Sequence, residues 1–457
     1  MAQVSPFTKA VVASMRHIYP EALADKSFDN TGLLLEAPIP SHLPRKHNSV
    51  LLTIDLTKAV ADEAIEENHS TVIAYHPIIF RGLKSITFDD PQQQTLLRLA
   101  SHGISVYCPH TAVDIVPKGM ADWLCDIVTG KIDPAPEPKA FTSEETLQQE
   151  QEQEQTIQTS ESASETDVTT SEDEGPITPS TNVSADPFID RKDHATPKPK
   201  QKRPANIHRT YSKPSYPSHI RNQQEENEDA PVHQAPSPIQ SSPNTTFRHS
   251  MIAHGRAVIT PSPSSAIDTA NTARSSSDST SYYTSSNTGS GRLITFDSPQ
   301  PLGNLITRIA HATGSPKGFP VAIPQNAHLE SIRVKTVGIC PGSGASVIKG
   351  CKEPPDLVFT GEMSHHEALA VIERGGSVIS LFHSNSERGY LDGVMRELLE
   401  AELQKRWKEG RNVGADDDSL KEILEDESVT VVVSRRDRDP FGIVVLQESQ
   451  QEGEAVG

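Results

Sequence analysis

Apolar residues in the first 130 positions follow two patterns that alternate along the chain. Stretches with apolar residues three or four positions apart are typical of amphipathic helices, and short apolar runs between turn residues are typical of buried strands. This alternation predicts an α/β layer with mostly parallel strands. Helices are expected at 5–18, 57–68 and 92–101, and strands at 31–35, 49–55, 71–74 and 104–107.

The same alternation returns at residue 291 and continues almost to the end of the chain. It predicts a second α/β layer. Helices are expected at 301–313, 364–374 and 387–407, and strands at 291–296, 320–323, 333–340, 356–360, 377–382 and 429–433.

Between these two segments the pattern disappears into tracts such as QQEQEQEQ and TSESASETDVTTSEDE. Tracts of this kind contain too few apolar side chains to bury a core. We therefore predict an α/β fold with two lobes around a long insert. The predicted boundaries are an N-terminal lobe at 1–130, a disordered insert at 131–290, a C-terminal lobe at 291–447 and a disordered tail at 448–457.

Composition and charge limit the classes of function. The 457 residues include 35 prolines and only 5% aromatic residues, so the folded part is smaller than the length suggests. A formal net charge of −19 excludes a general nucleic-acid binder, although it is compatible with a local basic patch. The cluster from Lys198 to Arg203 is either a nuclear-localisation signal or a solvated run of charges.

Cysteine usage indicates a reduced compartment, and hydropathy gives no sign of a membrane span. The four cysteines show no CxxC spacing, so neither a zinc knuckle nor a disulfide framework is expected. No apolar run approaches the length of about 18 residues that a membrane span needs. We expect a cytoplasmic protein. The predicted N-terminal helix carries Lys9 and Arg16 and no acid before Glu21, which leaves a mitochondrial fraction open alongside a nuclear one.

One internal similarity suggests that the two lobes are pseudo-equivalent. Residues 64–76 align without gaps on residues 371–383, and each stretch reads as helix, tight turn, buried strand, aromatic residue and histidine. Short matches of this kind also arise by chance. If the match is structural, two such units packed face to face would bring His76 and His383 together.

Polar side chains that bind metals stand just beyond several predicted strands. His383 follows the strand at 377–382, and Glu387 comes four residues later. His76 and Asp114 follow two strands of the first lobe. Because ligands of open α/β sheets sit outside the carboxyl ends of the strands, we expect a divalent metal there. Imidazole with carboxylate suits zinc, manganese or iron.

Other polar residues near these strands have two interpretations each. The turn Pro341–Gly344 either presents the N–H groups of Gly342 and Gly344 to a phosphate or is simply a tight turn, and it lacks the lysine of a P-loop. His110 either lines a binding site or is a surface histidine. For His365 and His366 we favour a surface or helix-capping position.

Several motifs resemble the NIF-three-like family, the NGG1p-interacting-factor group that is also labelled GTP cyclohydrolase I type 2-like. They include FDNTGLLLE at Phe28–Glu36, AYHPIIFRGLKSIT at Ala74–Thr87, PHTAVD at Pro109–Asp114, TGEMSHHEAL at Thr360–Leu369 and HSNSERGYL at His383–Leu391. The resemblance implies a two-lobed α/β fold with a pair of divalent ions between the lobes, often in a ring-shaped homo-oligomer. It also implies that His76 and Asp114 hold one ion, His383 the second, and that Glu387 bridges both.

The chain departs from the bacterial pattern of this family at one position. Tyr75 precedes His76, where the bacterial pattern has two consecutive histidines. A phenol with a pKa of about 10 ligates poorly at neutral pH. We therefore expect Tyr75 to face the site and the second ion to be weak or absent.

Two classes of function remain open. The chain is either a metal-dependent hydrolase of a nucleotide-like or phosphate-bearing small molecule, with Glu387 as a catalytic group, or an interaction partner of transcriptional or mitochondrial proteins in which the metal is structural or regulatory.

Overall fold

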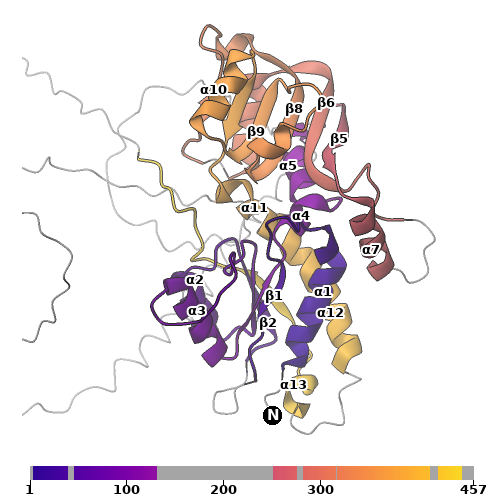
Figure 1. The fold of residues 1–457 in the computed structure, drawn as a ribbon, viewed down its shortest axis with the longest axis vertical. Coiled ribbons are helices and arrows are strands. Elements are labelled where there is room, and N and C mark those ends of the chain that lie inside the picture. The colour runs from indigo at the N-terminus through magenta and orange to yellow at the C-terminus, as the bar shows by residue number, and fades with distance from the viewer. Residues whose placement is uncertain are drawn as a thin grey trace, which may run out of the picture. The chain divides into compact units, whose positions relative to one another are not determined.

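The computed structural model describes residues 4–39, 46–130, 251–274, 281–314, 316–411 and 420–444. Within them the chain forms two β-sheets with helices on their faces, as the α/β pattern predicts (Figure 1). The expected insert between 131 and 250, its basic cluster at 198–203 and the expected tail at 448–457 lie outside the described residues. No helix in the described part of the chain is long and apolar enough to cross a membrane.

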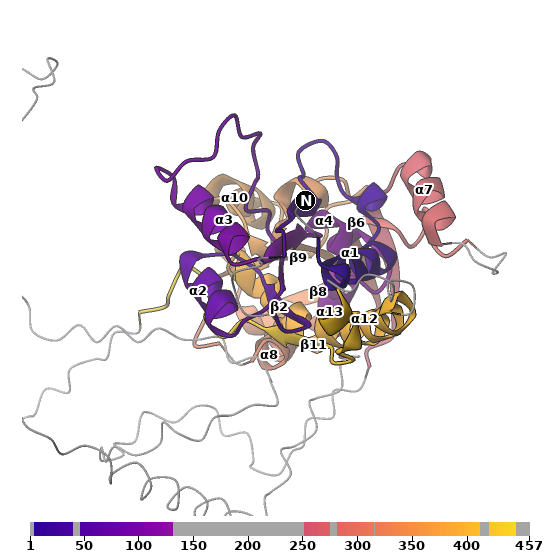
Figure 2. The same ribbon diagram turned by 90° about the horizontal axis from the view of Figure 1, so that it is seen from below.

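The first sheet has the strand order β1-β4-β3-β2-β11, and every pair except β1 with β4 is parallel. Helices α2 and α3 cover one face, and α1 and α12 lie on the other (Figure 2). The sheet is therefore buried on both sides, which explains the continuous apolar runs of its strands. Its elements are α1 (Pro6–Ile18), β1 (Gly32–Leu35), β2 (Ser49–Thr53), α2 (Lys58–Glu66), β3 (Thr71–Ala74), α3 (Pro91–Ser101), β4 (Ser105–Cys108), α12 (Arg396–Arg411) and β11 (Thr430–Val433).

The second sheet has the strand order β5-β6-β8-β9-β10-β7, with a parallel centre of β8, β9 and β10. Helices α5 and α8 pack on one face, and α9 and α10 pack on the other. Its elements are α5 (Met120–Thr129), β5 (His254–Pro261), β6 (Gly289–Pro301), α8 (Leu302–Ala312), β7 (Val321–Ala322), β8 (Arg333–Ser343), α9 (Ala345–Ile348), β9 (Leu357–Glu362), α10 (His365–Glu373) and β10 (Ser377–Ser380).

The two lobes exchange segments, which the predicted boundaries at 130 and 291 did not foresee. Helix α5, from the N-terminal part, packs against the second sheet, while α12 and β11, from the C-terminal part, return to the first sheet. A short run such as TVVV predicts a strand but does not say which sheet it joins, because strand pairing depends on partners distant in the sequence.

The ordered C-terminal part begins earlier than predicted. Strand β5 and helix α7 (Ser264–Arg274) fall inside the range 131–290 that we expected to be disordered. Both give weak signals, since none of the β5 residues is fully buried and α7 buries only Ile267 and Ala270. Edge elements of this kind need few apolar residues and resemble a polar linker in sequence.

The predicted helix at 387–407 is divided into three segments and is preceded by a 3-10 turn. The 3-10 turn Ser384–Ser386, the short α11 (Arg388–Tyr390) and the π-helical turn Leu391–Met395 precede α12. The strand before them also ends early, at Ser380, and Phe382 takes a left-handed backbone conformation with φ 69°. π-helical turns often occur at functional sites. This one begins at Leu391, four residues after Glu387.

Candidate metal centre

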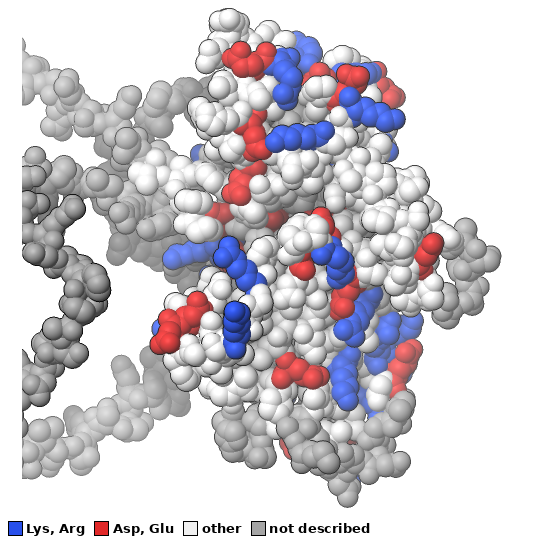
Figure 3. Space-filling view, in the orientation of Figure 1, with Lys and Arg blue, Asp and Glu red and all other residues white. Residues whose placement is uncertain are grey.

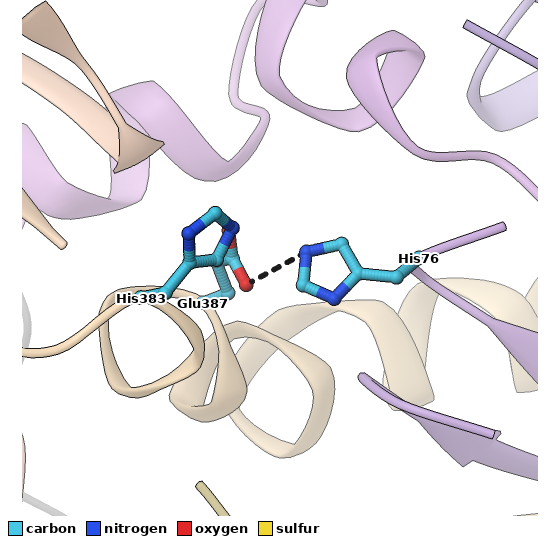
Figure 4. A group of neighbouring side chains, drawn as sticks. All are labelled: His76, His383 and Glu387. Carbon is cyan, nitrogen blue, oxygen red and sulfur yellow. Dashed lines mark ion pairs between the residues drawn. The ribbon is translucent and has the colours of Figure 1, made fainter. Parts of the chain in front are cut away.

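Three side chains from the two lobes meet beyond the ends of β3 and β10. Ligand atoms of His76, His383 and Glu387 all lie within 4.8 Å of one another (Figure 4). His76 Nε2 is 3.3 Å from Glu387 Oε2, and His383 Nε2 is 3.6 Å from Glu387 Oε1. The carboxylate therefore turns one oxygen to each imidazole, and the group could hold a metal ion.

The local structure fits a cation at this point. His76 Nε2 and Glu387 Oε2 are both buried without a hydrogen-bond partner among the described residues, although their separation permits an ion pair. A buried polar atom without a partner costs about 1–3 kcal/mol, so a ligand between these atoms would remove a penalty. Two nitrogens and a carboxylate form a donor set that zinc, manganese or iron accepts.

Electrostatics around His76 favour positive charge. Burial lowers the pKa of His76, but the negative charges of Glu387 and Asp55 outweigh it and raise the pKa to about 10. The field that favours a proton on Nε2 also favours a metal cation, which competes with that proton.

A second set of carboxylates orients the histidines. His76 Nδ1 is 2.9 Å from Asp55 Oδ1, and His383 Nδ1 is 3.0 Å from Glu362 Oε1. An Nδ1–H that donates to a carboxylate leaves Nε2 as the ligand nitrogen, an arrangement common around protein-bound metals. Sequence reasoning missed both partners. Asp55 is the last residue of the predicted strand 49–55, and Glu362 follows the predicted strand 356–360 within TGEMSHHEAL. Acidic residues at the ends of these strands were therefore the sequence signal that could have identified both.

Asp114 does not lie in the three-residue cluster. Its Oδ1 accepts a 2.8 Å hydrogen bond from the hydroxyl of Tyr75. Burial, together with the negative charges of Asp114 and Glu387, raises the pKa of Tyr75 well above its ordinary value. Burial likewise raises the pKa of Asp114, with Glu387 adding to the shift. A protonated phenol thus occupies one of the two carboxylate oxygens of Asp114, and the role of Asp114 as a metal ligand stays a prediction.

His110 lies beside the cluster. Its ring centroid is 5.5 Å from that of His76 and 5.4 Å from that of Tyr75, and its Nδ1 is 2.7 Å from Asp29 Oδ1. On its other side, Phe28 has its ring centroid 6.3 Å from His110 and 6.3 Å from Phe80. Phe28 and Phe80 are half exposed, so they form an aromatic surface next to the cluster.

Gly342 makes room for the cluster and does not present a free N–H to a phosphate. Its N–H donates to Ser386 Oγ at 2.9 Å, and the N–H of Gly344 donates to Thr360 Oγ1 at 3.0 Å. Because both N–H groups already have acceptors within the protein, this arrangement favours the interpretation as a tight turn. Gly342 has φ 58°, and a Cβ there would lie 2.7 Å from Glu387 Oε1 and 3.0 Å from His383 Nε2.

His365 and His366 lie in the exposed first turn of α10, outside the cluster, as their surface interpretation predicts. Ser364 and Glu367 form the capping box of that helix, so the two histidines are not needed as caps.

A separate cavity of about 430 Å³ is lined by residues of α1, α7 and α12, including Lys9, Arg16 and Arg406. Lysine and arginine side chains gather over α1 and α12 on one face of the protein (Figure 3). Arg16 pairs with Glu21 at 2.8 Å and Arg406 with Glu402 at 2.6 Å. The local basic patch that the net charge left open is thus partly neutralised by its own neighbours.

Comparisons with known proteins agree with the motifs. Residues 7–412 match the family described as Duf34/NIF3 (NGG1p interacting factor 3). The chain is 31% identical to the protein NIF3 homolog of Schizosaccharomyces pombe over 441 residues, which cover 96% of this chain and 98% of the relative. It is 26% identical to NGG1-interacting factor 3 of Saccharomyces cerevisiae over 95% of this chain and 96% of the relative. Among solved structures, the Bacillus cereus protein related to NIF3 is similar with a TM-score of 0.48 and 17% identity, over 95% of this chain and 98% of that chain.

Proposed function

Because this chain belongs to the Duf34/NIF3 (NGG1p interacting factor 3) family, we propose that it is a metal-dependent hydrolase of a nucleotide-like or phosphate-bearing small molecule. His76, His383 and Glu387 hold the divalent ion. The observation that carries this proposal is the buried Glu387 carboxylate between two imidazoles, each oriented by a second carboxylate.

A divalent cation bound there supplies Lewis acidity, which polarises a phosphoryl or carbonyl oxygen and makes water a better nucleophile near neutral pH. The chain's own residues orient the ligands and move a proton. Asp55 and Glu362 fix the tautomers of His76 and His383. Glu387, or His110 beside the cluster, moves a proton between water and the leaving group.

The aromatic surface of Phe28 and Phe80 supports a substrate with a planar ring. Both side chains are half exposed, and Phe28 contacts His110, which itself lies beside His76. Half-exposed phenyl rings next to a polar cluster gain contact area when a base or similar ring stacks on them. A nucleotide-like molecule would place its base on this surface and its polar group at the metal.

A second candidate is an interaction function with a structural or regulatory metal. The Saccharomyces cerevisiae relative is named NGG1-interacting factor 3, which favours a protein partner. A transcription-related partner is part of this proposal. The acidic, Ser/Thr-rich composition between 131 and 250 agrees with such a role. A cytoplasmic location, with a mitochondrial or nuclear fraction, and a homo-oligomeric state belong to this proposal as well.

Turnover of a nucleotide panel by metal-loaded protein separates the two candidates. We expect hydrolysis of at least one compound by the wild type and loss of it in Glu387→Gln. His365→Ala is the matched control, because this histidine is exposed and lies outside the cluster. Absence of turnover across the panel in protein with full metal content would favour the interaction function.

A further inference from the structure

The segment that follows β11 connects the parts of the two lobes that carry the cluster. Strand β11 pairs in parallel with β2, so the residues after it emerge where β2 ends, next to Ile54 and Asp55. Residues from Ser434 to Phe441 then reach the turn that holds His383 and Glu387. They lie beyond residues 7–412, the range matched by the family.

Asp437 contacts both lobes with one buried carboxylate. Its side chain is 3% exposed, and Oδ2 accepts a 2.7 Å hydrogen bond from the N–H of Ile54. The same carboxylate forms an ion pair with Arg388. Ile54 directly precedes Asp55, which holds His76 Nδ1, and Arg388 directly follows Glu387. Asp437 thus fixes the neighbour of one metal-site residue in each lobe.

Asp439 extends this contact to the start of the same turn. Its Oδ2 accepts a 2.7 Å hydrogen bond from Ser384 Oγ, which in turn accepts one of 2.8 Å from Arg388 Nη2. Ser384 directly follows His383. Together the two aspartates therefore hold the turn at both ends, one residue beyond each of its two candidate ligands.

Arg436, which directly precedes Asp437, makes a contact away from the turn that carries His383 and Glu387. Arg436 pairs with Glu66 of α2, and both side chains are largely exposed. An exposed pair of this type contributes little to stability. A buried pair such as Arg388 with Asp437 is costly to desolvate, and loss of one partner leaves an uncompensated charge. The two aspartates of the segment thus contact the turn, whereas Arg436 contacts α2.

We propose that Asp437 and Asp439 are positioning residues of the metal centre, which set the geometry of His383, Glu387 and Asp55 from a segment outside the matched family range. This inference rests on the metal site proposed above, but it does not depend on hydrolysis.

The test measures zinc affinity by competition with a chromogenic chelator in the full-length protein. Asp437→Asn should weaken zinc binding by about ten- to hundredfold, the usual effect of losing an outer-sphere partner. Ser384→Ala, a milder change, should weaken it by about tenfold. Arg436→Gln should bind zinc like the wild type. Thermal unfolding of each variant in EDTA reports any change in stability separately.

The outcomes are distinct. Wild-type zinc affinity in Asp437→Asn and Ser384→Ala would overturn the inference, even if their unfolding temperatures fall. The segment would then stabilise the fold without setting the geometry of the metal centre. An equal loss of affinity in Arg436→Gln would also overturn it. If Asp437→Asn does not fold, Ser384→Ala decides. A wild type that binds no zinc would overturn the metal site and this inference together, whereas unchanged variants of a zinc-binding wild type overturn this inference alone.

Discussion

The hydroxyl of Tyr75 donates a 2.8 Å hydrogen bond to Asp114 Oδ1 and so occupies a carboxylate oxygen beside the cluster. Burial raises the pKa of this phenol well above its ordinary value, which keeps the proton in place near neutral pH. We therefore predict that the chain binds one ion tightly, although it retains Asp114, the residue that the family resemblance assigns to a pair of ions.

Replacing Tyr75 with histidine should raise the number of tightly bound ions from about one to nearly two per chain. An imidazole with an ordinary pKa of about 6.5 is largely neutral at pH 7.5 and can coordinate a metal. Calorimetric titration with manganese or zinc measures the stoichiometry. Tyr75→Phe is the matched control, because it frees Asp114 Oδ1 without adding an imidazole. A gain of an ion in Tyr75→Phe equal to that in Tyr75→His would show that the release of Asp114, and not the added imidazole, creates the second site. Two tight equivalents in the wild type would disprove a weakened second site.

Gly342→Ala should lower metal affinity by about tenfold or more, in the range of lost outer-sphere contacts. The added Cβ would lie 2.7 Å from Glu387 Oε1, so the carboxylate must move. Gly375→Ala is the control: Gly375 also has a positive φ, of 85°, but a Cβ there meets nothing within 4 Å. Both variants carry backbone strain of about 1–2 kcal/mol. Equal metal affinities in the two would contradict the packing argument.

The helices and strands in the core of each lobe could be predicted from the sequence, because apolar periodicity and turn residues indicate the same elements there. The gapless match of 64–76 with 371–383 corresponds to a real equivalence: Asn68 and Gly375, which align, both adopt a left-handed conformation after a helix, with φ 58° and 85°. His76 and His383 accordingly meet, with ring centroids 5.2 Å apart. The exchange of α5 and β11 between lobes was not readable, because pairing over hundreds of residues leaves no local pattern.

The parts of the site that the sequence did not reveal have a similar cause. Asp55 and Glu362 look like ordinary acids at strand ends until the fold brings them to the Nδ1 atoms of two histidines. Asp437 lies in a charged run, SRRDRDP, that reads as solvent-exposed, yet its side chain is buried. Burial of a charge is decided by its tertiary partners and not by its neighbours in the sequence.

Asp122 Oδ1 lies 3.0 Å from Nε of the buried Arg292. This pair should make stability fall in acid. Burial raises the pKa of Asp122, but the charges of Arg292 and Arg256 outweigh it, and the net pKa is lowered. Because the folded pKa lies below the unfolded one, this stabilisation is present above the ordinary carboxyl pKa of about 3.9 and is lost as the pH falls through the folded value.

Asp122→Asn should therefore cost about 3 kcal/mol in the free energy of unfolding at pH 7. The difference from the wild type should shrink below about pH 4. Urea unfolding without bound metal at pH 7, 5 and 3 measures it. A difference that stays constant with pH would show that the charge of Asp122 is not responsible.

Deleting residues 140–240 and joining the ends with a flexible linker should leave the thermal transition and metal content unchanged. Loop-closure cost grows by only about 0.6 kcal/mol per doubling of length. A deletion extended through Thr284 should instead destabilise the protein, because it removes β5, α7 and the buried Tyr283. The comparison of both deletions by calorimetry tests the revised start of the C-terminal lobe. Equal stability of the two proteins would contradict it.

The metal content of purified protein tests the central claim most directly. Elemental analysis of the wild type should find about one equivalent of zinc, manganese or iron per chain, with a similar content in His365→Ala, whose side chain is exposed outside the cluster. His383→Ala should lose most of the metal, because the cluster then keeps only His76 and Glu387. Wild-type occupancy in His383→Ala would contradict the assignment of the metal to this site.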